Sequence, residues 1–129
     1  MTRTVIQPDR LKDPRPRYSQ GIVTEGGRLL FIAGQTAVDA EGNVVGKGDP
    51  EQQAEQVFRN LGAVLEAAGA TFDNLVMTTT YLTDIAYREA YNKVRLKYYR
   101  TCAPTSTLVV VTALGAPDFV IEIDGIAVI

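Results

Sequence analysis

The stretch Thr107–Leu114 is apolar at both its odd-numbered and its even-numbered positions. Alternate residues of a β-strand point to opposite faces of a sheet, so this stretch predicts a strand that is apolar on both faces. Such a strand is buried on both faces. The remainder of the chain must therefore provide cover on two sides, or a second copy must provide it on one.

The pattern along the 129 residues predicts six strands and only two helices. The first helix is expected over Pro50–Ala68, where apolar residues recur at three- and four-residue spacing after the N-cap Asp49. The second is expected after its N-cap Asp84 and runs to about Arg100, with a tyrosine-rich apolar face. The strands are expected at Arg3–Ile6, Tyr18–Glu25, Arg28–Ala33, Leu75–Leu82, Thr107–Leu114 and Phe119–Ile129, with a hairpin turn at Gly26-Gly27 between the second and third.

This order predicts an α+β fold in a single domain, residues 1–129, with both helices on one face of a mixed sheet. Two helices cover one sheet face and leave the other without cover inside the chain. We therefore expect homo-oligomerisation through the open sheet face.

Composition excludes several kinds of site. The chain has no histidine, which removes Ser-His-Asp and Cys-His catalysis and almost every zinc site. A single cysteine, Cys102, permits no internal disulfide. The net charge of −2 gives no electrostatic case for binding nucleic acid or a membrane surface. The proline-punctuated N-terminus does not resemble a signal peptide, and the apolar runs are too short to span a bilayer, so we expect a cytoplasmic protein.

Two acids in the last predicted strand are the best candidates for proton transfer. Glu122 and Asp124 are two positions apart, so both carboxylates should point to one face, roughly 7 Å apart. They stand in the otherwise uncharged segment VIEIDGIAVI, where burial would raise their pKa values toward the range useful for catalysis. Solvent exposure at a sheet edge is an equal alternative.

Other polar residues are weaker candidates. The Tyr18 phenol could orient a substrate or water, although a tyrosine at the start of a strand more commonly packs with its hydroxyl satisfied. Ser106 and Thr107 have no evident base to activate them. Cys102 lacks a histidine partner and is expected to be a partly buried, inert thiol.

Motifs along nearly the whole chain converge on one family: YSQG at 18–21, LLFIAGQTAVDAEGNVV at 29–45, NLGAVLEAAG at 60–69, TTTYLTD at 78–84 and IEIDGIAVI at 121–129. In this order they resemble the Rid family, the reactive intermediate deaminases formerly called the YjgF family. The resemblance implies a chorismate-mutase-like fold with a six-stranded sheet and two helices, and a homotrimer with clefts between neighbouring subunits. It also implies hydrolysis of 2-aminoacrylate and related enamines or imines to 2-keto acids and ammonia, without metal or cofactor.

The resemblance also implies roles for single residues. Tyr18 matches the Tyr, and Asn92 the Asn, that help to line the family's cleft. Asp124 stands where the last-strand acid that handles water is expected. Gly34 and Gln35 match the Gly-Gln pair that follows the third strand.

One departure changes the expected substrate. The family's Pro-Ala-Arg-Ser stretch, whose Arg binds the substrate carboxylate, appears here as Pro-Thr-Ser-Thr, and Ser106 takes the Arg position. We therefore expect a substrate other than a simple 2-imino acid such as 2-aminoacrylate. Ser106, Glu122 and the backbone near Thr107 would contribute to its binding.

The leading hypothesis is a trimeric hydrolase of imines or enamines, in which Asp124 activates water and Tyr18 positions the substrate. The alternative is a non-enzymatic trimer that binds a small metabolite or acts as a chaperone or regulator. RNA cleavage is disfavoured because the chain is slightly acidic and has no histidine and no basic–aromatic patch. The expected partners are a second copy and a small imine or enamine, with no nucleic acid and no membrane.

Overall fold

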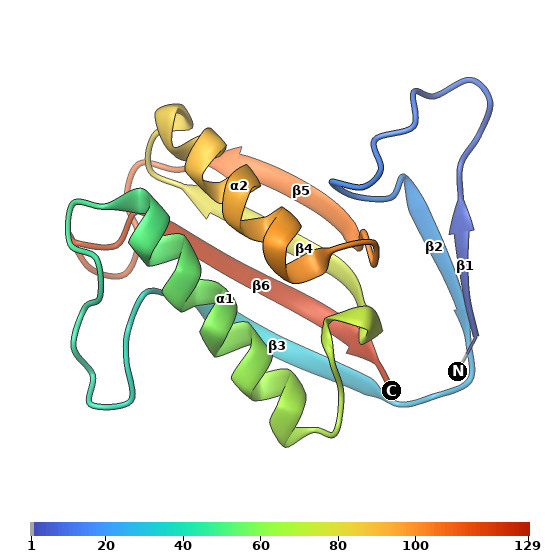
Figure 1. Ribbon diagram of the computed structural model, residues 1–129, viewed down its shortest axis with the longest axis horizontal. Helices are drawn as coiled ribbons and strands as arrows, with labels where there is room; N and C mark the ends of the chain where they lie inside the picture. Colours follow the sequence, from blue (N-terminus) through green and yellow to red (C-terminus); the bar gives the residue numbers. More distant parts are fainter. Residues whose placement is uncertain (1) are drawn as a thin grey trace.

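Residues 2–129 are described by a computed structural model, in which two helices lie across one face of a mixed sheet (Figure 1). The predicted α+β class, with six strands and two α-helices, is confirmed. The elements are β1 (Thr2–Ile6), β2 (Gly21–Glu25), β3 (Leu29–Gln35), α1 (Pro50–Ala67), the 3₁₀ turn η1 (Phe72–Asn74), β4 (Leu75–Leu82), the 3₁₀ turn η2 (Ile85–Tyr87), α2 (Arg88–Tyr99), β5 (Thr105–Val110) and β6 (Ile121–Val128).

Helix α1 forms where its periodicity predicted it. The Asp49 carboxylate accepts hydrogen bonds from the backbone N–H groups of Glu51 and Gln52 and so caps the helix. Gly69, with a φ of +76°, lets the chain turn away after the helix. The buried face of α1 comprises Gln53, Ala54, Val57, Phe58, Leu61 and Leu65.

Within residues 2–129, no helix combines the length and apolar composition needed to cross a bilayer.

The predicted second helix begins later than expected. Asp84 does act as an N-cap, but its carboxylate accepts from the N–H of Ala86 and caps η2, and α2 starts only at Arg88. The two helices pack through aromatic rings: the ring centroids of Phe58 and Tyr98 are 5.2 Å apart. The tyrosine-rich face of α2 is therefore part of the core, as its spacing predicted.

The main sheet has four strands in the order β3-β6-β4-β5. Strand β4 occupies the predicted residues, pairs antiparallel with β6 and pairs parallel with β5. Strand β6 lies between β3 and β4, so the IEIDGIAV segment occupies the centre of the sheet. In this register Asp124, Thr79 and Thr107 lie side by side on three adjacent strands.

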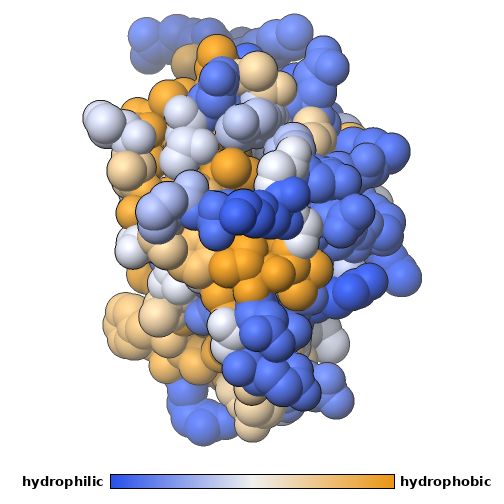
Figure 2. Space-filling model, turned by 90° about the vertical axis from the view of Figure 1, so that its left-hand side faces the viewer, coloured by the Kyte–Doolittle hydropathy of each residue, from blue (hydrophilic) through white to orange (hydrophobic). Residues whose placement is uncertain are grey.

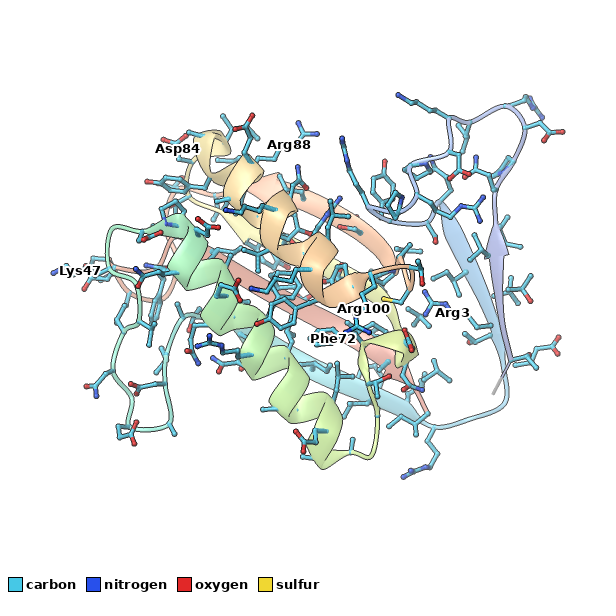
Figure 3. The ribbon with its side chains drawn as sticks, viewed as in Figure 1. Arg3, Lys47, Phe72, Asp84, Arg88 and Arg100 are labelled. Carbon is cyan, nitrogen blue, oxygen red and sulfur yellow. The ribbon has the colours of Figure 1, made fainter. Side chains whose placement is uncertain are left out.

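The six strands do not form one continuous sheet, which differs from the expectation. Strands β1 and β2 pair with each other in a separate antiparallel ribbon, seen at the right of Figure 1, so the predicted hairpin at Gly26-Gly27 is wrong. Other contacts hold this ribbon: Arg3 donates to the carbonyls of Asp73 and Cys102 (Figure 3), and the Ser19 hydroxyl donates to Ala103 O. We call residues 2–25 the N-terminal arm.

The sheet face opposite the helices exposes several large apolar side chains. Leu29, Phe31 and Met77 are 62%, 69% and 47% exposed. Figure 2 shows the contrast: hydrophilic side chains cover the helix side at the right, and apolar ones gather along the left, on the open sheet side. The strand predicted at Thr107–Leu114 is β5, which ends at Val110, and neither of its faces is fully buried in one copy: Val109 and Val110 are exposed, whereas Leu108 packs against the core. Cover of this face by a second copy stays a prediction.

Candidate functional site

The two acids of β6 lie on the open face of the sheet. Glu122 and Asp124 alternate with Ile121, Ile123 and Gly125, which are buried on the helix side. Both acids are half-buried. Their two-residue spacing thus places both carboxylates on one face, as predicted, and that face is the one without helices.

Asp124 is held by two hydrogen bonds. Its carboxylate accepts from the backbone N–H of Thr79 and from the hydroxyl of Tyr81, each at 3.2 Å. The hydrogen bond to Asp124, together with its negative charge, raises the pKa of the Tyr81 phenol. The same two donors fix the position of the Asp124 carboxylate.

Glu122 has both carboxylate oxygens free. Within residues 2–129 it accepts no hydrogen bond and forms no ion pair. Its carboxylate lies over Gly34 of β3, where a Cβ atom would overlap Oε2. The absence of a side chain at Gly34 thus leaves room for the Glu122 carboxylate to lie against the backbone of β3. Gly34 and Asp124 also line a shallow hollow of about 370 Å³ on the open face, together with Phe31, Ile32, Ala33, Met77, Thr79, Gly125 and Ile126. We call this hollow, together with the adjoining carboxylate of Glu122, the acid face.

A second group of predicted residues meets elsewhere. Tyr18 from the N-terminal arm, Asn92 from α2 and Ser106 from β5 line one cavity of about 290 Å³. These residues are far apart in the sequence, and the position of the arm beside α2 and β5 brings them together. Three arginines and one leucine complete the lining: Arg17, Arg88, Arg95 and Leu108. We call this space the arginine cavity.

Sequence reasoning missed Arg95. A basic residue of an amphipathic helix normally lies on its solvated side, yet the Arg95 side chain is only 5% exposed. The signal was its spacing: Arg95 stands four residues after Tyr91 and next to Val94, on the buried stripe of α2. Arg88, at the start of α2, is exposed at the rim (Figure 3).

Within one copy the acid face and the arginine cavity are separate. Ser106 pairs with Thr78, whose side chain is buried on the helix side, whereas Asp124 pairs with Thr79 on the open side. Thr107 lies on the open side beside Thr79 and is exposed. Gln35 is in neither group, because its amide donates to Ala33 O and it lines a third hollow next to Asn60. A single chain thus presents two separate groups of candidate residues.

Cys102 has the properties of an inert thiol. Burial raises the pKa of its thiol to about 11, so the reactive thiolate is scarce at neutral pH. Among residues 2–129, no three His, Cys, Asp or Glu side chains cluster closely enough to hold a metal ion.

Comparison with known proteins identifies the family. A family model described as Endoribonuclease L-PSP matches residues 9–129. The solved structure of YyfB, described as a conserved Rid-family protein of unknown function from Yersinia pestis, superposes with a TM-score of 0.92 at 34% identity, over 100% of both chains. The chain belongs to the Rid family.

Two curated relatives extend the comparison. The RutC family protein slr0709 of Synechocystis is 39% identical over 131 residues, covering 100% of this chain and 98% of the relative. The human 2-iminobutanoate/2-iminopropanoate deaminase is 30% identical over 128 residues, covering 99% of this chain and 91% of the relative. The Rid family therefore includes a named imine deaminase of similar length.

Proposed function

We propose that this Rid-family protein hydrolyses an imine or enamine to a carbonyl compound and ammonia. The observation that carries the proposal is the convergence of Tyr18, Asn92 and Ser106 in one cavity. They stand at three positions where the resemblance expects substrate-binding residues. The relationship to a human protein named as an imine deaminase supports the same chemistry.

The reaction needs one group that moves a proton. An enamine first takes up a proton at carbon to give the protonated imine. Water adds to the carbon of the protonated C=N bond and gives up a proton to a carboxylate, which leaves a neutral amino alcohol. The carboxylic acid returns this proton to the nitrogen, the C–N bond breaks, and ammonia leaves as the hydroxyl oxygen forms the C=O bond and releases its proton to the carboxylate. A carboxylate positioned beside the water serves as base and then as acid.

Glu122 is better suited than Asp124 to this proton transfer, because within residues 2–129 only Asp124 already accepts hydrogen bonds. Asp124, the residue that the resemblance points to, already accepts from Thr79 and Tyr81, whereas Glu122 has free oxygens beside Gly34. We assign proton transfer to Glu122 and a positioning role to Asp124, which holds the neighbouring surface in place. The assignment of the acid to Asp124 stays a prediction that paired variants decide.

We further propose that the site forms between copies of a homotrimer. One copy would supply the arginine cavity and its neighbour the acid face, because a single chain holds these half-sites on opposite sides of its sheet. Burial of the exposed Leu29, Phe31 and Met77 would favour the assembly. The substrate is proposed to differ from 2-aminoacrylate, because Ser106 replaces the carboxylate-binding Arg.

Ammonia release tests the activity directly. Imines generated in place from a panel of amino acids by an amino-acid oxidase should release ammonia faster with the protein than without it. The heat-denatured protein is the control. Equal rates across the whole panel, with and without the protein, would favour the non-enzymatic binding module instead.

A further inference from the structure

Arg95 is a buried cation without a counter-ion. Its side chain is 5% exposed, and within residues 2–129 it forms no ion pair with any carboxylate. Its guanidinium carbon lies 4.8 Å from the centroid of the Tyr91 ring, a cation–π contact that compensates only part of the lost hydration. An unpaired buried charge is costly, so a functional reason for keeping it is expected.

Most donors of this guanidinium are unused. Nη1 donates to the Tyr91 hydroxyl at 2.8 Å and makes a long contact of 3.5 Å with Ser106 Oγ. Nε is buried and has no acceptor, and among the described residues Nη2 has none either. Nη2 therefore retains N–H donors for an anionic oxygen such as that of a carboxylate.

The surroundings of Arg95 are positively charged. The cavity that it lines also receives Arg17 from the arm and Arg88 from α2, and none of its described lining residues is acidic. Both additional arginines are exposed, so they would attract an anion to the entrance, whereas Arg95 would hold it inside. The volume of about 290 Å³ suits a small organic anion.

We propose that Arg95 binds the carboxylate of the substrate and so replaces, from α2, the arginine that is missing at residue 106 of β5. This proposal rests on the proposed deaminase function and names its substrate class. Ser106 is short enough to leave the space beside Arg95 open.

The position of Arg95 also indicates the length of the substrate. A guanidinium at residue 106 would stand at the tip of a long side chain, whereas Arg95 lies at the level of Ser106 Oγ, near the base of that side chain. A substrate carboxylate bound by Arg95 would therefore lie nearer to the helix layer than one bound by an arginine at residue 106. The substrate class is an imine whose carboxylate is separated from the C=N bond by additional carbon atoms.

Calorimetric titration with 4-oxopentanoate tests the proposal without requiring turnover. This probe carries a carboxylate two carbons from its carbonyl group, and 2-pentanone has the same carbon chain without the charge. The wild-type protein should bind 4-oxopentanoate at least about tenfold more tightly than 2-pentanone. Arg95→Met should abolish that preference, and Arg95→Lys should retain part of it. Arg28→Gln removes one exposed positive charge outside the cavity and should leave the preference unchanged.

Thermal unfolding separates binding from a structural role. Methionine is shorter than arginine but neutral, so the desolvation cost that it removes should offset the lost packing and leave the Tm near the wild-type value. An Arg95→Met protein with a lowered Tm and unchanged binding would overturn the proposal. Tighter binding of inorganic phosphate than of 4-oxopentanoate would also overturn it. In a further outcome, the Arg95→Met variant loses carboxylate binding and the wild-type protein releases no ammonia from any imine. That outcome would reject the proposed activity but keep the carboxylate site.

Discussion

Glu122→Gln should lower the rate of ammonia release by about 10²- to 10⁴-fold, the usual contribution of a group that transfers protons in the transition state. The amide has the shape of the carboxylate but cannot take a proton from water. Glu122 contributes no hydrogen bond or ion pair within residues 2–129, so the Tm of the variant should remain within a few degrees of the wild type.

Asp124→Asn is the matched comparison on the same strand face. It should weaken the hydrogen bonds with Thr79 and Tyr81 and reduce the rate by about tenfold or less, because the role proposed for Asp124 is to position its neighbours and not to transfer a proton. It should also lower the pKa of Tyr81, since the charge that raises it is removed, and titration of tyrosine absorbance measures this change. A larger rate loss in Asp124→Asn than in Glu122→Gln would assign proton transfer to Asp124, as the sequence resemblance does.

Ser106→Arg should raise the turnover of 2-aminoacrylate by about a hundredfold or more. A bidentate arginine–carboxylate contact supplies two charge-assisted hydrogen bonds, each worth about 1.5–3 kcal/mol, and 1.4 kcal/mol corresponds to a tenfold change in rate. Because Arg95 lies close to Ser106, the increase should be larger in the Arg95→Met background, where the two cations do not repel each other.

The measurement is the disappearance of 2-aminoacrylate, generated by a dehydratase, with wild type and variants in parallel. Ser106→Gln is the control for size without charge and should remain as slow as the wild type. Rapid turnover by the wild type would contradict the account, because it would mean that another cation, such as Arg17, already holds this short substrate.

Periodicity predicted best those elements whose buried faces pack against the core of the same copy. The apolar stripe of α1 and the β-branched run of β4 face a single core and matched closely. The hairpin at Gly26-Gly27 failed for a different reason. A glycine pair permits a tight turn but does not select which strands pair, and the contacts of Arg3 and Ser19 hold the arm away from β3.

The site was predictable to the extent that it depends on local geometry. The two-residue spacing of Glu122 and Asp124 was enough to place them on one face. The sequence did not indicate that Asp124 is already hydrogen-bonded, because Thr79 and Tyr81 come from another strand. Arg95 was missed because arginine is normally solvated, and its burial depends on packing against Tyr91.

The central claim is that one copy supplies the arginine cavity and its neighbour supplies the acid. Co-expression of two inactive variants with different tags tests it most directly: Asn92→Trp, which fills the cavity, and Glu122→Gln, which removes the acid. Assemblies that carry both tags should have the mass of a trimer by light scattering. Each trimer that carries both tags pairs an intact cavity with an intact acid at one of its three interfaces, so these purified mixed trimers should release ammonia at about a third of the wild-type rate. Mixed trimers as inactive as either parent, or a monomer at micromolar concentration, would contradict the claim.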